Sequence, residues 1–173
     1  MIWNLIAIVA IIALDQWTKY LTVAYVEPVG TIPLIQDAVH LTYVENRGAA
    51  FSLLEGQVTL FVVITLAVIV ALSFLLWKHG KVHPALRISL VMILGGAVGN
   101  LIDRVWLGYV RDMIDFRIIN YAVFNVADCF VVVGTILLAL YILLWDRTLL
   151  SRSDKAERAA AEGEQPEETK HPE

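Results

Sequence analysis

The chain has a single cysteine, few charges and none of the common metal or nucleotide motifs, and each absence excludes a class of function. Cys129 stands alone, so neither an intrachain disulfide nor a CxxC metal site can form. The motifs HExxH and GxGD and the P-loop do not occur. No basic patch indicates binding to nucleic acid. We therefore expect no metal, no other cofactor and no nucleic-acid partner.

Hydrophobic residues take the place of the missing charges. They make up 58% of the chain, and charged residues only 17%, whereas soluble domains are about 45–50% apolar. Four apolar segments, at about 2–25, 57–77, 84–102 and 122–145, are long enough to cross a bilayer core, for which about 20 residues suffice. The first lacks a basic start and an A-x-A-like cleavage site, so we interpret it as a retained span. An all-α membrane protein with four transmembrane helices is predicted, as one domain over residues 1–150.

Basic residues predict how the spans are oriented. They cluster between the second and third spans and after the fourth: Lys78, Lys81, Arg87, Arg147, Arg152, Lys155 and Arg158. Because basic residues favour the cytoplasmic side, both termini are predicted to be cytoplasmic, with segments of about 26–56 and 104–121 outside. The tail 151–173 is rich in Glu, Ala, Lys and Pro, which predicts a disordered cytoplasmic extension.

The outer segment 26–56 is predicted to be more than a linker. Residues 39–44 are β-prone and partly alternate between apolar and polar. Pro28, Gly30 and Pro33 interrupt the stretch before them. We expect a small β-rich platform on the extracytoplasmic surface.

Polar residues recur at helical spacing near the outer ends of three spans. Residues three or four apart share one face of a helix. The sets are Asp15 with Lys19, Asn100 with Asp103 and Arg104, and Asn125 with Asp128. Because three helices carry a polar stripe at the same predicted depth, we expect one shared interior site.

Three glycines accompany the polar stripe of the third span. Gly95 and Gly99 are expected to permit close packing of helices, the common use of glycine in membranes. Gly96 lies four residues before Asn100, so it could instead let a backbone or a substrate approach the site.

Carboxylates are the strongest candidates for chemistry. Ionisable groups near a membrane interior are costly and are functional candidates by default, and two carboxylates suffice for acid–base hydrolysis without a metal. Asp15 and Asp103 could instead serve only in ion pairs, and Asp112 and Asp115 could be ordinary loop residues. Asp128 is the hardest to explain structurally, because it begins an apolar span with no cation nearby in the sequence.

The other nucleophiles and bases are weaker candidates. Most serines have no evident base partner, although Ser52 with Lys19 remains an alternative. His79 and His83 are expected on a solvated cytoplasmic face, and the isolated His40 on the surface of the outer segment.

Five motifs, in this order, resemble those of the lipoprotein signal peptidases (signal peptidase II). They are DQWTK at 15–19, NRGAAFS at 46–52, GGAVGNLIDR at 95–104, GYVRD at 108–112 and FNVAD at 124–128. The resemblance covers residues 10 to 145, and the order and the four-span frame make the set specific. Cys129 departs from the serine often found after the last motif, at a position interpreted as packing.

The resemblance implies an aspartic endopeptidase of the bacterial cytoplasmic (inner) membrane. Such an enzyme cuts the signal peptide of a prolipoprotein immediately before its diacylglyceryl-modified cysteine, at the extracytoplasmic face. The catalytic pair falls on Asp112 and Asp128, with Asp115 as the rival match three residues later. Residues that would bind substrate or support the site are Asp15, Lys19, Asn46, Gly48, Gly96, Asn100, Asp103, Arg104, Asn125 and Ala127.

The expected partners are prolipoprotein substrates and membrane lipids, with the protein acting as a monomer. The alternative reading is a non-enzymatic membrane scaffold or small proton-coupled transporter that uses the buried carboxylates as a proton relay. The absence of GxGD argues against a prepilin-type aspartic protease.

Overall fold

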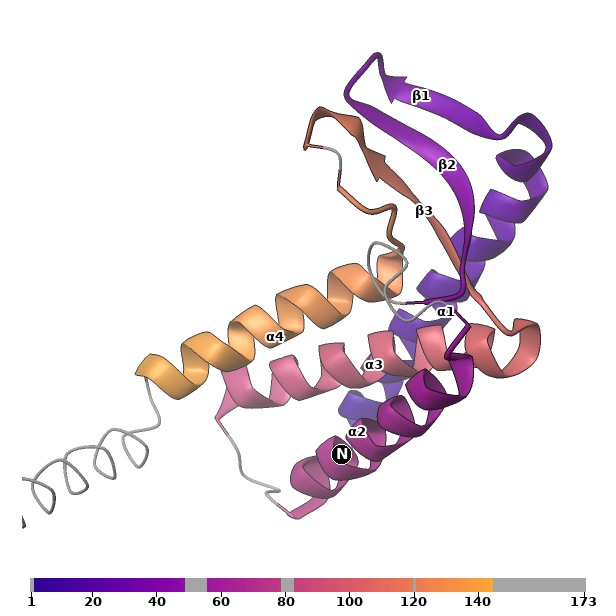
Figure 1. Ribbon diagram of the computed structural model, residues 1–173. Coiled ribbons are helices and arrows are strands. Elements are labelled where there is room, and N and C mark those ends of the chain that lie inside the picture. The colour runs from indigo at the N-terminus through magenta and orange to yellow at the C-terminus, as the bar shows by residue number, and fades with distance from the viewer. Residues whose placement is uncertain (1, 49–55, 79–82, 120, 145–173) are drawn as a thin grey trace, which may run out of the picture. The chain divides into compact units, whose positions relative to one another are not determined.

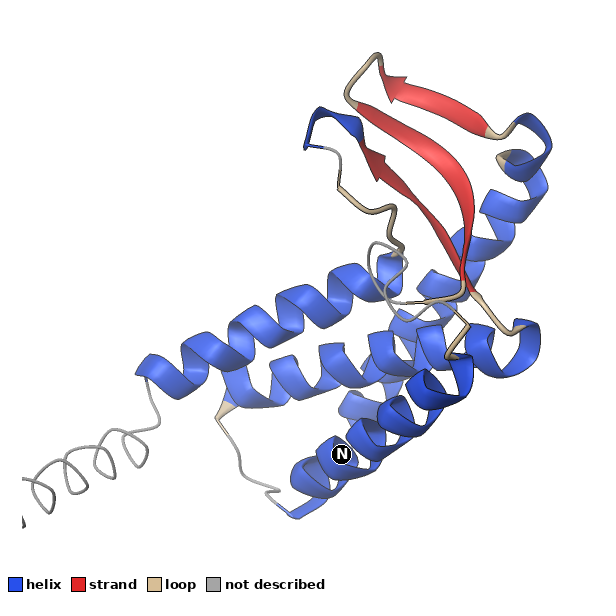
Figure 2. Ribbon diagram, in the orientation of Figure 1, coloured by secondary structure: helices blue, strands red, loops and turns tan. Residues whose placement is uncertain are grey.

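Four long helices and a three-stranded sheet make up the part of the chain that this computed structural model describes, residues 2–48, 56–78, 83–119 and 121–144 (Figures 1 and 2). The helices are α1 (Ile2–Tyr25), α2 (Val58–Lys78), α3 (Pro84–Leu107) and α4 (Val126–Leu144). The strands are β1 (Thr31–Ile35), β2 (Val39–Asn46) and β3 (Val110–Phe116), flanked by the short 3₁₀ helices η1 (Glu27–Val29) and η3 (Arg117–Ile119). All four long helices are apolar enough to cross a membrane. The predicted fold class, four transmembrane helices with a small sheet, is confirmed.

Some predictions fall on residues outside these ranges. They concern the tail 151–173, the basic residues after the fourth span, and the residues Ser52, His79 and Lys81. The chain divides into two units, Met1–Leu138 and Ala139–Glu173. The first unit contains every contact discussed below, and the described part of the second is only the end of α4.

Helix α3 extends further than the predicted third span. It begins after His83, whose Nδ1 accepts the backbone N–H of Ala85 (3.2 Å). It ends at Gly108, which has φ 79° and donates its N–H to the carbonyl oxygen of Arg104. The predicted third span, 84–102, is thus five residues shorter than the helix, because Gly108 is the residue that takes the left-handed conformation of a helix end.

Helix α4 begins four residues later than predicted. Residues 122–125 are not helical, because Phe124 joins the edge of the sheet instead. The N–H of Ile114 donates to Phe124 O (2.8 Å), and the N–H of Phe124 donates to Ile114 O (3.1 Å). Asn125, predicted to lie on the fourth span, is therefore the residue that precedes the helix.

The three glycines of α3 allow neighbouring elements to approach closely. A Cβ atom on Gly95 would lie 2.7 Å from Ile11 Cγ2 of α1, and one on Gly99 would lie 2.6 Å from Asp15 Oδ2. A Cβ atom on Gly96 would collide with the carbonyl oxygen of Ala127 at the start of α4. All three glycines thus serve packing. Of the two groups expected to approach Gly96, a backbone or a substrate, the structure shows the backbone of Ala127.

The sheet is antiparallel with the strand order β1-β2-β3. Strand β2 pairs with β3 so that Val44 lies opposite Asp112 and His40 opposite Asp115. The register shifts between Leu41 and Val44, as at a β-bulge, which bends a strand and redirects its side chains. The shift sets which residues of β2 reach the buried end of β3.

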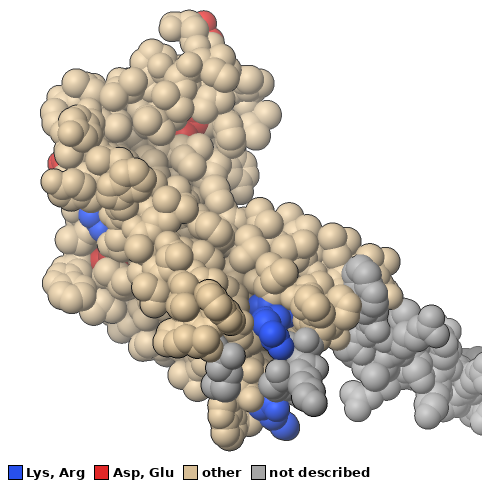
Figure 3. All heavy atoms as spheres, turned by 180° about the vertical axis from the view of Figure 1, so that it is seen from behind, with Lys and Arg blue, Asp and Glu red and all other residues tan. Residues whose placement is uncertain are grey.

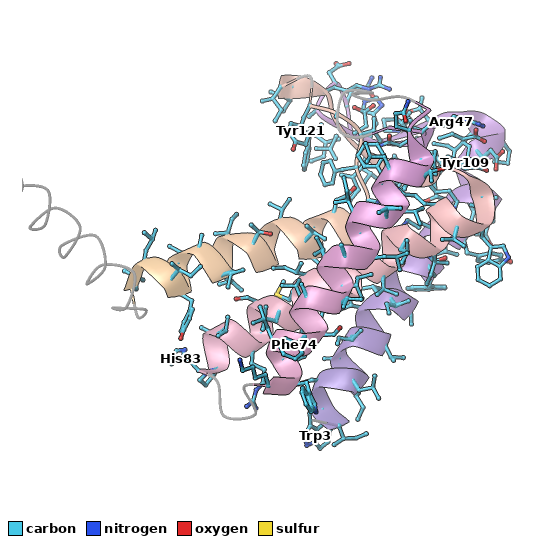
Figure 4. The ribbon with its side chains drawn as sticks, turned by 60° about the horizontal axis from the view of Figure 1, so that its bottom comes forward. Trp3, Arg47, Phe74, His83, Tyr109 and Tyr121 are labelled. Atoms are coloured by element: carbon cyan, nitrogen blue, oxygen red, sulfur yellow. The ribbon has the colours of Figure 1, made fainter. Side chains whose placement is uncertain are left out.

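The sheet lies at one end of the described helices. In Figure 4, Arg47, Tyr109 and Tyr121 lie at this end, whereas Trp3 and His83 lie at the other. The surface over the helices in Figure 3 carries few charged side chains, as expected for segments that face lipid. The two ends of the described helices are therefore distinct.

The orientation predicted from the basic residues can be tested by cysteine labelling. In a Cys129→Ser background, Gln36→Cys is expected to react with an impermeant thiol reagent from outside the cell. Asp154→Cys is expected to react only after the membrane is opened, because the basic clusters predict that both termini are cytoplasmic. Labelling of both positions from the same side would contradict this topology.

Candidate active site

The polar stripes of α1, α3 and α4 converge with β3 in one buried cluster. Its side chains are almost completely removed from solvent, with exposed fractions of 0–7%: Asp15, Lys19, Asn100, Asp103, Asp112 and Asn125. Burying a charge without a partner is costly, so the contacts of these groups define the site.

Asp128 belongs to a reciprocal cap at the start of α4. Its own backbone N–H donates to Asn125 Oδ1 (2.9 Å), and the backbone N–H of Asn125 donates to Asp128 Oδ2 (3.1 Å). This is the capping-box arrangement, with aspartate in place of the usual glutamate or glutamine. The first turn of α4 thereby fixes both side chains.

Two asparagines link Asp128 to Asp112. Asn125 Nδ2 donates to Asp112 Oδ1 (2.6 Å) and to Asn100 Oδ1 (3.0 Å). Asn100 Nδ2 in turn donates to Asp128 Oδ1 (2.7 Å). Both protons of the Asn125 amide are used and its oxygen is occupied by the cap, which fixes the orientation of the amide. We call this chain of contacts the asparagine bridge.

Strand β2 holds the other side of Asp112. Asn46 Nδ2 donates to Asp112 Oδ2 (2.9 Å), and Asn46 Oδ1 accepts the backbone N–H of Gly48 (3.0 Å). Burial, followed by the charge of Asp128, raises the pKa of Asp112 from 3.8 to about 7, against the opposing hydrogen bonds from Asn46 and Asn125. A carboxyl with this pKa can hold or release a proton near neutral pH.

Lys19 joins the asparagine bridge to a cluster of ion pairs. Its Nζ lies 2.8 Å from Asp15 Oδ2 and 3.5 Å from Asp103 Oδ2, and it donates to Asn100 Oδ1 (2.9 Å). Asp15 Oδ1 also accepts the backbone N–H of Ala127 (3.0 Å). Asp15 therefore pairs with Lys19, as the structural alternative expected, but the pair also braces α4 and Asn100.

Two residues of this cluster were not predicted as site residues. Gln16 Nε2 donates to Asp15 Oδ2 and Asp103 Oδ1 (3.1 Å each), and Arg111 binds Asp103 through its backbone and its guanidinium. Gln16 is adjacent to Asp15 within one of the recognised motifs, which could have suggested its role. Arg111 likewise lies within a recognised motif, at 108–112, and Asp103 was allowed an ion pair, but the sequence does not indicate that the two residues meet.

Asp115 lies apart from the asparagine bridge. Its Oδ2 accepts Thr42 Oγ1 and Arg117 Nε (2.9 Å each), and the side chain of Arg117 is 43% exposed. Although burial opposes the change, these hydrogen bonds lower the pKa of Asp115.

His40, expected at the surface, is instead buried at 6% exposure, and its Nε2 has no partner among the described residues.

A cavity of about 240 Å³ opens beside Asp128. Its polar lining comes from Thr65, Asn100, Arg104 and Asp128. Its apolar walls come from α2, α3 and α4: Ile64, Val68, Ile93, Ala97 and Val131. The guanidinium of Arg104 also lies over the ring of Phe61, 5.3 Å from its centroid. The cavity thus brings an apolar groove to one of the two bridged carboxylates.

Known proteins are similar to this chain in sequence. The family model "Signal peptidase (SPase) II" matches residues 7–144. The lipoprotein signal peptidase of Caldanaerobacter subterraneus subsp. tengcongensis is 51% identical, covering 81% of this chain and 95% of its own. The one from Clostridioides difficile is 47% identical, covering 82% and 95%.

The fold is also that of solved bacterial membrane enzymes. One, solved by the in meso method at 2.3 Å, has a TM-score of 0.75 and 28% identity over 98% of this chain and 96% of its own. Another, at 1.9 Å, has a TM-score of 0.74 and 31% identity over 84% and 95%. With a family model that matches four membrane helices and the whole buried cluster, the chain belongs to the signal peptidase II family.

Proposed function

We propose that the chain is an aspartic endopeptidase that cuts diacylglyceryl-modified prolipoproteins immediately before the lipidated cysteine. Its family makes it a peptidase for the signal peptides of prolipoproteins, so the scaffold or transporter alternative is set aside. The asparagine bridge carries the finer proposal, because it holds Asp112 and Asp128 as one hydrogen-bonded unit. Two carboxylates that share a single proton can divide the work of hydrolysis.

Asp112 fits the role of the proton donor. Its pKa of about 7 keeps it protonated below neutrality, so its O–H can donate to the oxygen of the scissile carbonyl. Asp128, which lines the cavity, accepts a proton from the attacking water. The water oxygen bonds to the carbonyl carbon and gives a tetrahedral intermediate. The C–N bond then breaks as the leaving amine takes the proton from Asp128, and the re-forming carbonyl returns a proton to Asp112.

The supporting residues divide into two groups. Asn46, Asn100 and Asn125 orient the carboxylates through the hydrogen bonds described above. Arg104 lines the cavity, where its guanidinium is placed to bind carbonyl oxygens of the substrate backbone. Gly96 and Ala127 let α3 and α4 approach closely enough for the asparagine bridge to form.

The sheet end of the molecule is proposed to face the outside of the cytoplasmic membrane. The basic residues between α2 and α3, at the opposite end, support this orientation, because basic residues favour the cytoplasmic side. With the site at the outer interface, the acyl chains of a lipidated substrate stay in the bilayer during cleavage. The enzyme is proposed to act as a monomer without a metal or other cofactor.

The direct test is cleavage of a lipidated precursor. Purified protein is incubated with a diacylglyceryl-modified prolipoprotein, and loss of the signal peptide is followed as a shift on a gel. The new N-terminus is then identified by mass spectrometry. We expect the signal peptide to be released, with the modified cysteine as the new N-terminal residue. An intact precursor, or a cut at another bond, would contradict the proposal.

The rate of cleavage is expected to fall as the pH rises through about 7. Asp112 loses its proton in that range, and two ionised carboxylates leave no donor for the carbonyl oxygen. Because its folded pKa is raised, Asp112 also stabilises the fold at low pH, a contribution lost as the pH rises through about 7. The measurement is kcat for the lipidated precursor on both sides of neutrality. If kcat keeps rising above pH 7, the protonated form of Asp112 is not needed for the reaction.

A further inference from the structure

We infer that Arg111 is a positioning residue for this reaction, an inference that rests on the proposed function. Arg111 directly precedes Asp112 on β3. Neighbouring residues of a strand point to opposite faces of the sheet. Asp112 reaches the asparagine bridge, and the side chain of Arg111 reaches a different partner, Asp103 of α3.

Both the backbone and the side chain of Arg111 bind Asp103. Asp103 Oδ2 accepts the Arg111 backbone N–H (3.0 Å) and Nε–H (3.1 Å), and Asp103 Oδ1 accepts Nη2–H (2.7 Å). Nη2 also donates to Gln16 Oε1 (2.9 Å). The carboxylate of Asp103 is fully buried, and the side chain of Arg111 is 16% exposed. A two-pronged arginine–carboxylate pair fixes geometry as well as charge, so β3 is attached to α3 at the residue beside Asp112.

The same pair sets the position of Lys19. The ion pairs beside the asparagine bridge join two cations, Lys19 and Arg111, to two carboxylates, Asp15 and Asp103. Because Asp103 has Arg111 as its own partner, Lys19 stays closer to Asp15 (2.8 Å) than to Asp103 (3.5 Å). In that place Lys19 can donate to Asn100.

Removal of Arg111 changes this balance. Asp103 is then a buried carboxylate whose nearest cation is Lys19, and an unpaired buried charge is strongly unfavourable. Lys19 is drawn from Asn100 toward Asp103. The movement of Lys19 disturbs Asp128 through Asn100, the amide that donates to Asp128. Asp112 is disturbed separately, because β3 loses its attachment to α3 at the neighbouring residue.

The test compares Arg111→Met and Arg111→Lys with the control Arg117→Met. Arg111→Met is expected to lower kcat by about tenfold to 100-fold, the scale of a small misplacement of catalytic groups. KM should be unchanged, because Arg111 does not line the cavity. Both limbs of the pH profile of kcat should move to higher pH, since the loss of a nearby positive charge makes a carboxylate harder to ionise.

The conservative variant separates charge from geometry. Arg111→Lys keeps the charge and loses the two-pronged contact, so the pH limbs should stay in place while kcat falls less. Arg117 pairs with Asp115 on the exposed side of the sheet, and Arg117→Met should retain wild-type kinetics. If Arg111→Met does not fold, as judged by thermal unfolding, Arg111→Lys decides the matter: lowered kcat supports the inference, and wild-type kcat overturns it.

Wild-type protein and Asp112→Asn are assayed alongside. If the wild type cleaves, Asp112→Asn does not, and Arg111→Met keeps wild-type kcat and pH limbs, this inference alone fails. A loss as large in Arg117→Met as in Arg111→Met would also overturn it. If Asp112→Asn remains active, it is the proposed catalytic pair that fails.

Discussion

Asp112→Asn and Asp128→Asn are each expected to abolish measurable cleavage of a lipidated precursor. Asparagine can neither donate an acidic proton nor accept one from water, and a positioned acid or base contributes about 10²–10⁴-fold to the rate. The two carboxylates act as a unit in the proposed mechanism, so either loss alone should cost about as much as both together. The measurement is the rate of the gel shift for each variant, with thermal unfolding as a check that the variant is folded.

Asp115→Asn is the matched control for this experiment. Asp115 lies on the same strand as Asp112 but pairs with Thr42 and the exposed Arg117. Its loss should leave most of the activity, because surface ion pairs contribute about 0–1 kcal/mol. An inactive Asp115 variant beside an active Asp112 variant would mean that the motif register is wrong.

The second large effect is expected when the substrate lacks its lipid. Burial of each acyl methylene is worth about 0.8 kcal/mol, so a diacylglyceryl group holds the scissile bond at the membrane. The proposed site lies at the outer interface, where Asp112 and Asp128 would meet that bond. An unlipidated precursor with the same peptide sequence should be cut far more slowly, even at saturating concentration, because its cysteine is not held at this depth.

The assay places both precursors in the same bilayer or detergent. Rates are compared at saturating substrate, so that a difference reports positioning as well as affinity. Asp112→Asn provides the background for each precursor. Comparable rates for the two precursors would show that the peptide alone is recognised and that the acyl chains do not position the substrate.

Much of the fold could be predicted because its signals are local. The length of each apolar segment and the spacing of Asp15 with Lys19 or Asn125 with Asp128 follow from the chain alone. Helix ends were the main errors, and each has a tertiary or backbone cause. The left-handed conformation of Gly108 ends α3, and the pairing of Phe124 with Ile114 delays α4.

In the candidate site, too, local patterns were predictable from the sequence and long-range contacts were not. The sequence by itself determined the polar stripes and the order of the motifs, since both are patterns of residue type and spacing. Only the tertiary structure brought Asn46 to Asp112, 66 residues apart, and buried Asp112 while leaving Asp115 beside an exposed arginine. That outcome depends on the register of β2 against β3, in which a shift by one residue would turn every side chain to the other face. The attachment of Arg111 to Asp103 likewise exists only once β3 lies across the end of α3, because nothing in the composition of either segment encodes the contact.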